Sequence, residues 1–353
     1  MENRSFLSFP IYAYTRTRAL GFTAEGFLLN LAGLLTPGKR KSLPDLPVDL
    51  IPEVGARARE LLIRDAERIA QGVISPRVLI PEHPRIHLQR LPALLMDSVG
   101  LGARRFKGRT TEFSKKAAEL LDELPRYYRR NFHFQTDGYL SEDSGEIYEH
   151  QVEILFGGTA DAMRRLLIPS LKEAYGDGRG TRFLEIGAGT GRMTRFIAQN
   201  FPKAQIVATD LSAPYLQVAR RKLDPYSRVS FLQAAGEQLP FRDSGFDAVI
   251  SCFLFHELPE EVRKNVLRES LRVLKPGGRI GLIDSLQKQD AEELSRIFEL
   301  FPALFHEPYY RNYSETPMED LAGGVFADHD WVDQKELGFL SKALWSRPLK
   351  VKQ

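Results

Sequence analysis

The sequence predicts an α/β fold with a doubly wound, mostly parallel sheet, and two observations carry this prediction. From residue 182 onward, short apolar runs of strand length alternate with amphipathic segments of helix length. A glycine-rich turn at residues 187–191 joins the first of these strands to the helical pattern that follows it. A strand, a glycine turn and a helix in this order form the nucleotide-binding half of a doubly wound fold.

The composition is that of a globular protein and excludes several classes. Of the 353 residues, 43% are hydrophobic and 27% are charged, which is enough apolar material for a sizeable core or two domains. A formal net charge of +3 gives no sign of a nucleic-acid-binding surface. Cys252 is the only cysteine, which excludes an internal disulfide and a cysteine-rich metal site. The start does not resemble a signal peptide, and the apolar run at residues 26–35 is too short to cross a bilayer, so we expect a cytoplasmic protein.

Residues 1–135 contain no recognisable motif and predict a mainly helical accessory region. Helical spacing of apolar residues favours helices at 23–35, 53–70, 92–99 and 111–124, the second with Pro52 as its first residue. The prolines at 76, 81 and 84 predict an extended chain between the second and third helices. Basic residues gather here, and two interpretations stay open: a solvated helical cap on the next domain, or a surface that contacts an anionic membrane. They are Arg104, Arg105, Lys107, Arg109, Arg126, Arg129 and Arg130.

Residues 136–353 predict an α/β domain that begins with two helices. Ser141 and Ser144 are suitable caps for a helix that runs to residue 156, and a second helix is expected at 159–173. A glycine-rich linker at 176–180 then leads to the first strand.

The glycine turn and the end of the next strand carry ligand-binding features. Gly187, Gly189 and Gly191 stand at alternate positions, so the chain can turn sharply and a ligand can lie against bare backbone. Glu185 precedes the turn by two residues. The second predicted strand ends in Asp210, 19 residues after Gly191 (210 − 191), close to the ~20 expected of a carboxylate that binds ribose hydroxyls.

The pattern E-x-G-x-G-x-G at residues 185–191 resembles motif I of the class I S-adenosylmethionine (SAM)-dependent methyltransferases. The residues from Asp210 resemble the family's D-x-S-x-x-M, with Tyr215 in place of the methionine. Later segments resemble its D-A-E-x-L-P-F, with Ala235 in place of the aspartate, and its L-K-P-G-G turn. The substitution at residue 235 removes a side-chain contact to the adenine amine. The resemblance spans residues 139–347 and is strongest to the small-molecule branch that includes ubiquinone/menaquinone methyltransferases.

This resemblance implies a Rossmann-like, seven-stranded, mostly parallel sheet with helices on both faces and an antiparallel final pair. It also implies SAM as the cofactor, and methyl transfer to oxygen, carbon or sulfur of a small, apolar or aromatic acceptor. Many members place a helical lid with a tyrosine over the cofactor, for which Tyr139 and Tyr148 are the candidates; aromatic packing between helices is the alternative. The cofactor-binding residues would be Glu185, Gly187, Gly189, Gly191, Asp210, Leu211, Gly236, Glu237 and Phe253.

His256 is the candidate catalytic residue. It follows the fourth predicted strand, and the ends of parallel strands line the ligand crevice of such folds. An unperturbed pKa of about 6.5 suits proton transfer near neutrality, and a hydrogen bond that orients the loop is the alternative role. Glu257 is expected to be solvated or to cap a helix. Tyr309 and Tyr310, in an aromatic segment, are candidate acceptor contacts, although core packing explains that segment nearly as well.

Other chemistries find less support. We expect no metal site, because His83 and His87 lie in a segment predicted to be extended, and His133 and His150 stand alone. The Asn/Asp-Pro-Pro-Tyr/Phe motif of base methylation is absent, so nucleic acid is not the expected substrate. Two alternatives to a small-molecule enzyme are a membrane-docked methyltransferase that acts on a lipid or quinone, and a non-catalytic SAM-binding assembly protein. The complete glycine turn and Asp210 favour an enzyme. The sequence specifies neither the acceptor nor the oligomeric state.

Overall fold

The computed structural model describes residues 2–34, 47–80, 84–327 and 329–351, and it confirms the predicted fold class. Seven strands form one sheet in the order β3-β2-β1-β4-β5-β7-β6. The first five strands pair in parallel, whereas β7 is antiparallel to both β5 and β6. The strands are β1 (Arg182–Ile186), β2 (Gln205–Asp210), β3 (Val229–Gln233), β4 (Phe246–Cys252), β5 (Leu274–Ser285), β6 (His329–Leu337) and β7 (Ser341–Val351).

The order of the strands places a crevice at the carboxyl end of β1. Strand β2 lies on one side of β1 and β4 lies on the other, which makes this the topological switch point where open α/β sheets bind ligands. Ile186 at the end of β1 pairs with Thr209 of β2 and Ser251 of β4. The glycine turn, Asp210 and the loop after β4 therefore leave the sheet side by side.

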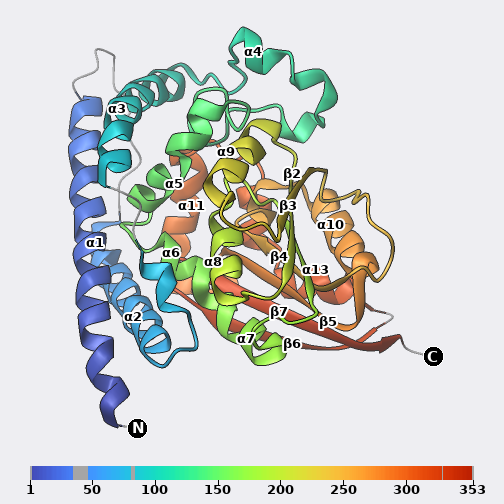
Figure 1. Cartoon of the computed structure of the whole chain (residues 1–353). Helices are drawn as coiled ribbons and strands as arrows, with labels where there is room; N and C mark the ends of the chain where they lie inside the picture. Colours follow the sequence, from blue (N-terminus) through green and yellow to red (C-terminus); the bar gives the residue numbers. More distant parts are fainter. Residues whose placement is uncertain (1, 35–46, 81–83, 328, 352–353) are drawn as a thin grey trace.

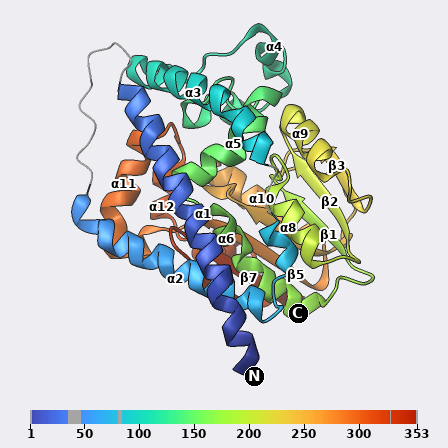
Figure 2. The ribbon, with the colours of Figure 1, turned by 60° about the vertical axis from the view of Figure 1, so that its left-hand side comes forward.

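Helices cover both faces of the sheet, as Figures 1 and 2 show. Phe183 of β1 belongs to a core that includes residues of α7 and α8, whereas Leu184 belongs to a core with α10 and α13. A parallel strand buried on both faces needs a continuous apolar run, which is what the sequence provides. These and the neighbouring helices are α7 (Ile168–Tyr175), α8 (Arg192–Asn200), α9 (Ala213–Leu223), α10 (Glu260–Val273), α11 (Ser295–Leu304), α12 (Tyr310–Glu315) and α13 (Met318–Val325).

Long N-terminal helices lie against one side of the sheet domain, with α1 along the outside and α2, α3 and α5 beside it (Figures 1 and 2). Leu61 of α2 lies in the same core as Phe183 and Met163. Arg165 binds Asp65 of α2 through two hydrogen bonds of 2.9 and 2.6 Å, and both side chains are buried. The helices are α1 (Glu2–Leu34), α2 (Ile51–Ala70), α3 (Pro84–Lys107), α4 (Lys115–Ala118), α5 (Glu142–Leu155) and α6 (Ala160–Arg164). The domain boundary at residue 135 stays a prediction. No described helix is both long and apolar enough to cross a membrane.

The helix predicted at 53–70 is confirmed as α2, with proline in its first turn, but four other predictions need correction. The segment 23–35 is the end of α1, which begins at Glu2 and contains Pro10, and residue 35 lies outside the described part of the chain. The segment 92–99 is the middle of α3. Pro84 begins this helix because a first-turn residue needs no backbone donor, so the extended chain predicted there is wrong at this point. The segment 111–124 forms only α4 and short 3₁₀ turns, because its buried residues Ala117 and Leu124 pack through turns rather than along one helix face.

The two helices predicted before the sheet are present, with one break. Helix α5 begins after Ser141, whose Oγ accepts a hydrogen bond from the Ser144 N–H at 3.1 Å. The helix predicted at 159–173 is divided into α6, a 3₁₀ turn and α7. Pro169 stands in the first turn of α7, where it has no N–H to continue a preceding helix.

Candidate active site

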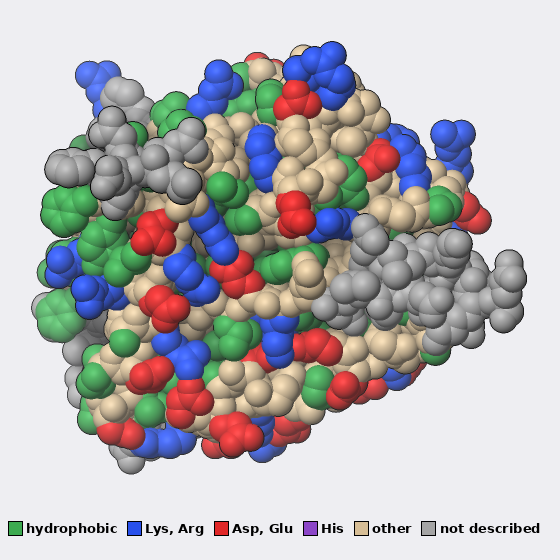
Figure 3. Space-filling view, turned by 90° about the horizontal axis from the view of Figure 1, so that it is seen from below, with side chains coloured by type: hydrophobic (Ala, Val, Ile, Leu, Met, Phe, Trp, Pro, Cys, Tyr) green, Lys and Arg blue, Asp and Glu red, His purple; other side chains and the backbone are tan. Residues whose placement is uncertain are grey.

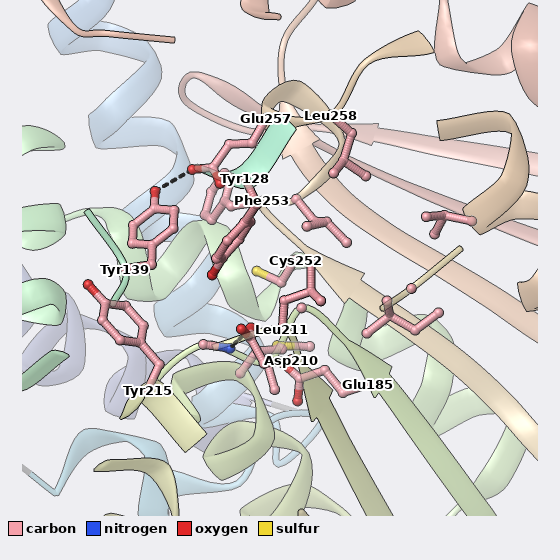
Figure 4. Close-up of a pocket in the computed structure, with 18 of the residues that line it drawn as sticks. Tyr128, Tyr139, Glu185, Asp210, Leu211, Tyr215, Cys252, Phe253, Glu257 and Leu258 are labelled. Carbon is pink, nitrogen blue, oxygen red and sulfur yellow. Dashed lines mark hydrogen bonds between the residues drawn. The ribbon is translucent and has the colours of Figure 1, made fainter. Parts of the chain in front are cut away.

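A cavity opens at the carboxyl ends of β1, β2 and β4, where the topology places the crevice (Figure 4). Its wall contains eight of the nine predicted cofactor-binding residues: Glu185, Gly187, Gly189, Asp210, Leu211, Gly236, Glu237 and Phe253. The ninth, Gly191, lies behind the wall at the start of α8. The structure thus brings together residues that are up to 68 positions apart in the sequence (253 − 185).

Backbone conformation explains the glycines of the turn. Gly187 has a φ of 71°, and a Cβ there would lie 3.0 Å from the side chain of Leu254. Gly191 has a φ of 83°, and a Cβ there would lie 2.7 Å from Leu223. Any other residue would therefore strain the turn, while glycine leaves bare backbone facing the cavity.

Asp210 is a buried carboxylate at the end of β2. Its two oxygens accept backbone hydrogen bonds from Gly189 and Ser212, each at 2.7 Å, which fixes the side chain beside the glycine turn. Burial raises the pKa of Asp210 to about 6, although these backbone donors oppose the shift. The carboxyl is therefore ionised at neutral pH and has lone pairs left for further donors.

Glu185 lies below the turn with its Oε2 accepting a hydrogen bond from the Thr194 hydroxyl at 2.6 Å. Burial raises the pKa of Glu185 to about 8, and the carboxyl is only 1% exposed. The Glu185 carboxyl is therefore largely protonated at neutral pH. It lies at the base of the turn next to Asp210 (Figure 4).

The cavity is rich in acids and aromatic rings. Five carboxyl groups line it, from Glu149, Glu185, Asp210, Glu237 and Glu257, of which Glu185 is largely protonated. The two guanidinium groups in the wall are already engaged by acids. Its aromatic residues include Tyr127, Tyr128, Phe132, Tyr139, Tyr148 and Phe253. An acidic cavity with aromatic faces suits a ligand that carries positive charge, and a buried carboxylate beside bare backbone suits a ribose. These residues therefore fit the sulfonium and the nucleoside of SAM.

Three contacts at this wall were missed at the sequence level. Arg164 binds Glu149 at 3.0 Å, and the Thr190 hydroxyl donates to Glu149 at 2.6 Å. The Tyr127 hydroxyl donates to Glu237 at 2.7 Å. No spacing pattern joins Glu149, Arg164 and Tyr127 to the glycine turn, because they come from separate helices and turns.

Tyr139 and Tyr148 both lie in the wall, as the lid prediction requires. Their ring centroids are 5.7 Å apart, and that of Tyr139 lies 5.3 Å from the ring of Tyr215. The Tyr139 hydroxyl points at Glu257 and donates to its Oε1 at 2.5 Å (Figure 4). The two interpretations made from the sequence, lid and aromatic packing, therefore describe the same residues.

A buried acid–histidine chain runs from the cavity wall into the protein through Glu257, His133, Glu307, His256 and Asp284. His133 Nε2 lies 3.5 Å from Glu257 Oε1, and His133 Nδ1 lies 3.2 Å from Glu307 Oε1. His256 Nε2 lies 3.7 Å from Glu307 Oε2, and its Nδ1 lies 2.6 Å from Asp284 Oδ1. Burial would lower the pKa of His256, but Asp284 and Glu307 outweigh it and raise that pKa to about 10.

The acid–histidine chain changes the roles predicted from the sequence. His256 is not in the cavity wall, because its ring is turned toward Asp284. Glu257, expected to be solvated or capping, is 8% exposed and lines the cavity. Tyr309 and Tyr310 do not line this cavity either: Tyr310 shares a hydrogen bond with Ser285, and Tyr309 packs beside the cluster of Phe132 and Tyr139.

Two groups of described residues have the composition of metal-ligand sets, where the sequence led us to expect none. Glu25, His87 and His150 converge from α1, α3 and α5, and His133, Glu257 and Glu307 converge in the acid–histidine chain, each with ligand atoms within 4.8 Å of one another. His83 lies outside the described residues. Spacing within one segment could not reveal either group, because each draws on three separate segments.

Comparison with known proteins points to one family. Residues 183–278 match a family described as a methyltransferase domain. The ubiquinone/menaquinone biosynthesis C-methyltransferase UbiE of Pseudomonas paraeruginosa is 34% identical over 158 residues, which cover 44% of this chain and 59% of that protein. The corresponding protein of Pseudomonas savastanoi pv. phaseolicola is 33% identical over 162 residues, 45% of this chain and 60% of its own. This chain thus spans about three fifths of the length of these curated relatives.

Among solved structures, a SAM-dependent methyltransferase from Aquifex aeolicus aligns with 51% of this chain and 88% of its own at 21% identity, with a TM-score of 0.39. The family match covers the glycine turn, Asp210 and the turn after α10, all of which carried the resemblance. The prediction made from those segments is confirmed: the chain carries a class I SAM-dependent methyltransferase domain, with SAM as its cofactor.

Proposed function

We propose that this chain transfers a methyl group from SAM to oxygen, carbon or sulfur of a small acceptor with an apolar or aromatic body. The observation that supports this most directly is Asp210, a buried carboxylate that two backbone N–H groups hold beside the bare glycine turn. A non-catalytic SAM-binding protein would need this feature, but it would have no use for an acid–histidine chain that begins in the same wall.

Asp210, Leu211, Glu237 and the backbone at Gly187 and Gly189 would hold SAM, which supplies a methyl group on a positively charged sulfur when bound. The carboxylate of Asp210 would accept hydrogen bonds from the two ribose hydroxyls with its remaining lone pairs. Aromatic side chains over the cavity exclude water from the reacting atoms.

Glu257 is the group that takes the proton of the acceptor. A hydroxyl, a thiol or an acidic C–H that gains a methyl group must lose its proton, and a positioned base accelerates that loss. Glu257 lines the cavity, and His133 lies behind it within 3.5 Å. Burial opposes a charge on His133, but Glu307 and Glu257 outweigh this and raise its pKa. The raised pKa favours the charged form of His133, which stabilises a negative charge on Glu257. Glu307 and His256 act as positioning residues.

Replacement of Glu257 by Gln tests this assignment. We expect turnover to fall by about 10²-fold at saturating SAM, since a general base contributes about 10²–10⁴-fold, and calorimetric titration checks that the variant still binds SAM. The assay follows transfer of labelled methyl from SAM to a panel of phenols, quinols, thiols and lipids. Glu261→Gln is the matched control, because Glu261 is exposed on α10. Equal turnover in Glu257→Gln and wild type would exclude this base. No transfer to any acceptor by a SAM-binding wild type would favour the assembly-protein alternative.

Exposed apolar side chains on α1 and α3 favour a second candidate, a membrane-docked enzyme that takes its acceptor from the bilayer. On each helix, three of the exposed apolar residues recur at intervals of seven and eight, which places those three on one side of the helix. Phe27 is 69% exposed and Met96 is 77% exposed. Figure 3, the view from below, shows further hydrophobic side chains at its left-hand margin, the side on which the N-terminal end of α1 lies in Figure 1. The six residues are Leu20, Phe27, Leu28, Leu88, Leu95 and Met96.

Lys107, exposed in the last turn of α3, adds attraction to anionic lipid. Co-sedimentation of the full chain with phosphatidylglycerol vesicles tests this candidate. We expect binding, and a loss of about tenfold in the double variant Leu20→Ser, Met96→Ser, because each apolar side chain contributes ~1 kcal/mol or more on burial. Ile80→Ser is the control, since Ile80 is 60% exposed but lies outside both helices. No vesicle binding would contradict docking, and self-association that the double variant abolishes would assign this face to a second copy of the chain.

A further inference from the structure

A second and larger cavity lies between the N-terminal helices α1 and α3 and helix α5. Its volume is about 600 Å³, within the ~300–1,000 Å³ range of small-molecule sites. Most of its wall is apolar, with Phe27 and Leu29 from α1, Leu94 and Leu101 from α3, and Ile154 and Leu155 from α5. No family motif covers α1 or α3, since the family match begins at residue 183.

This cavity meets the methyltransferase site. Tyr148 lines both cavities. His133 lines the larger cavity, and its Nε2 lies 3.5 Å from Glu257, which lines the cofactor cavity. The start of the acid–histidine chain therefore stands where the two cavities approach each other.

The cofactor cavity is the smaller of the two. It measures about 90 Å³, against about 600 Å³ for its neighbour. The larger cavity can therefore take the body of a methyl acceptor whose reacting atom reaches the cofactor.

The polar groups in the larger cavity are mostly engaged with one another. Gln135 donates to Gln151 at 2.8 Å, and Gln151 donates to Asp97 at 2.7 Å. Arg105 is the exception, since it is half-buried in the wall and no ion pair joins it to any carboxylate in the described part of the chain. The wall thus offers mostly apolar contact, with the Arg105 guanidinium as a cationic group that pairs with no carboxylate of the described residues.

We propose that this second cavity is the acceptor chamber: it holds the apolar body of an acceptor that carries one anionic or carbonyl group opposite Arg105. This inference rests on the methyltransferase function proposed above. The nucleophilic atom of the acceptor leaves the chamber beside Tyr148 and His133 and meets the methyl group there. Its proton passes to Glu257 as the new bond to the methyl carbon forms and the bond from that carbon to sulfur breaks. The N-terminal helices α1 and α3 are then part of the substrate site rather than a passive cap.

Binding of 11-(dansylamino)undecanoic acid, an apolar chain with a carboxylate, tests the chamber in the full chain without SAM. The variant Gly102→Phe adds bulk at the chamber wall, where nothing lies within 4 Å of an added Cβ. The matched control is Gly55→Phe on α2, which is equally unobstructed and outside the chamber. We expect saturable, one-site binding that weakens at least about tenfold in Gly102→Phe and is unchanged in Gly55→Phe. Leu101→Trp is a second filling variant that should act like Gly102→Phe.

A separate pair of variants tests the role of the Arg105 guanidinium. Arg105→Met should weaken binding of the carboxylate probe about tenfold, the order expected for a charge-assisted contact, whereas Lys107→Met, exposed on the same helix, should not. SAM is also titrated into every variant by calorimetry, and we expect each variant to bind SAM with the affinity of the wild type. Equal probe binding in wild type and both filling variants would overturn the chamber while SAM binding still supports the methyltransferase. Absence of SAM binding in the wild type would overturn the proposed function, and the probe would still report whether the chamber exists.

Discussion

We expect the ionisation state of Asp210 to determine how well the cofactor cavity binds a cis-diol. Its carboxyl is buried, and its pKa is raised to about 6, so it is ionised above that pH and protonated below it. A protonated carboxyl loses accepting capacity and presents a hydrogen where a hydroxyl donor would lie.

The affinity for SAM should therefore fall as the pH drops through about 6, by up to about tenfold per pH unit. Calorimetric titrations between pH 5 and pH 8 measure this. Asp210→Asn is the control: it should bind SAM more weakly at pH 8 and show little pH dependence. An affinity of the wild type that is constant across this range would show that the charge of Asp210 does not contribute.

Glu257 and His133 show what the sequence could not reveal at the residue scale. They are 124 positions apart (257 − 133) and meet only because the segment around His133 folds over the end of β4. Asp210 could be predicted because its distance from the glycine turn is set by one strand–helix–strand unit. His256 was placed on the right loop, but its side-chain direction depends on Asp284 of another strand.

The glycine turn between β1 and α8 is the element on which the cofactor site depends. Gly191→Ala should destabilise the chain by ~1–3 kcal/mol, because its φ is 83° and the added Cβ would lie 2.7 Å from Leu223. Gly323→Ala in α13 is the matched control, since nothing lies within 4 Å of its Cβ, and it should stabilise the helix by up to ~1 kcal/mol. Urea denaturation measures both, and equal stability of Gly191→Ala and wild type would contradict the strain inferred here.

The elements predicted best are those whose apolar residues lie on one side of a helix or form a continuous run in a strand. The apolar run of β1 and the amphipathic face of α2 gave correct types and near-correct bounds. Helix α1 was found only at its end, because apolar residues occur on its outer face as well as toward the core, as the exposed Leu20 and Phe27 show. In α3, Pro84 suggested an extended chain and Pro92 suggested the start of a helix. In the structure Pro84 begins the helix, and Pro92 is accommodated inside it.

At the scale of the whole molecule, the N-terminal helices and the sheet share a core. Leu61 and Leu62 of α2 lie in the cluster that contains Phe183 of β1 and Phe196 of α8. A region that completes the core of the sheet domain unfolds together with it. The two regions predicted from the sequence are therefore expected to behave as one cooperative unit.

Replacement of Asp65 by Asn tests this coupling. Asp65 and Arg165 are buried partners, and removal of the carboxylate leaves a buried guanidinium without it, so the free energy of unfolding should fall by ~3–5 kcal/mol. The single unfolding transition of the wild type should move as a whole to lower denaturant concentration. Glu60→Gln, on the exposed side of the same helix, should change stability by less than ~0.5 kcal/mol. Two separate transitions in the wild type would contradict a shared core.

The most direct test of the methyltransferase assignment is calorimetric titration of SAM into the wild type and into Asp210→Ala. Asp224→Ala is the matched control, because Asp224 is exposed at the end of α9 and away from the cavity. We expect one SAM per chain in the wild type and in the control, and a loss of at least about tenfold in Asp210→Ala, since two hydrogen bonds to a charged group disappear. A folded wild-type chain that binds no SAM, or an Asp210→Ala variant that binds it equally well, would contradict the site described here.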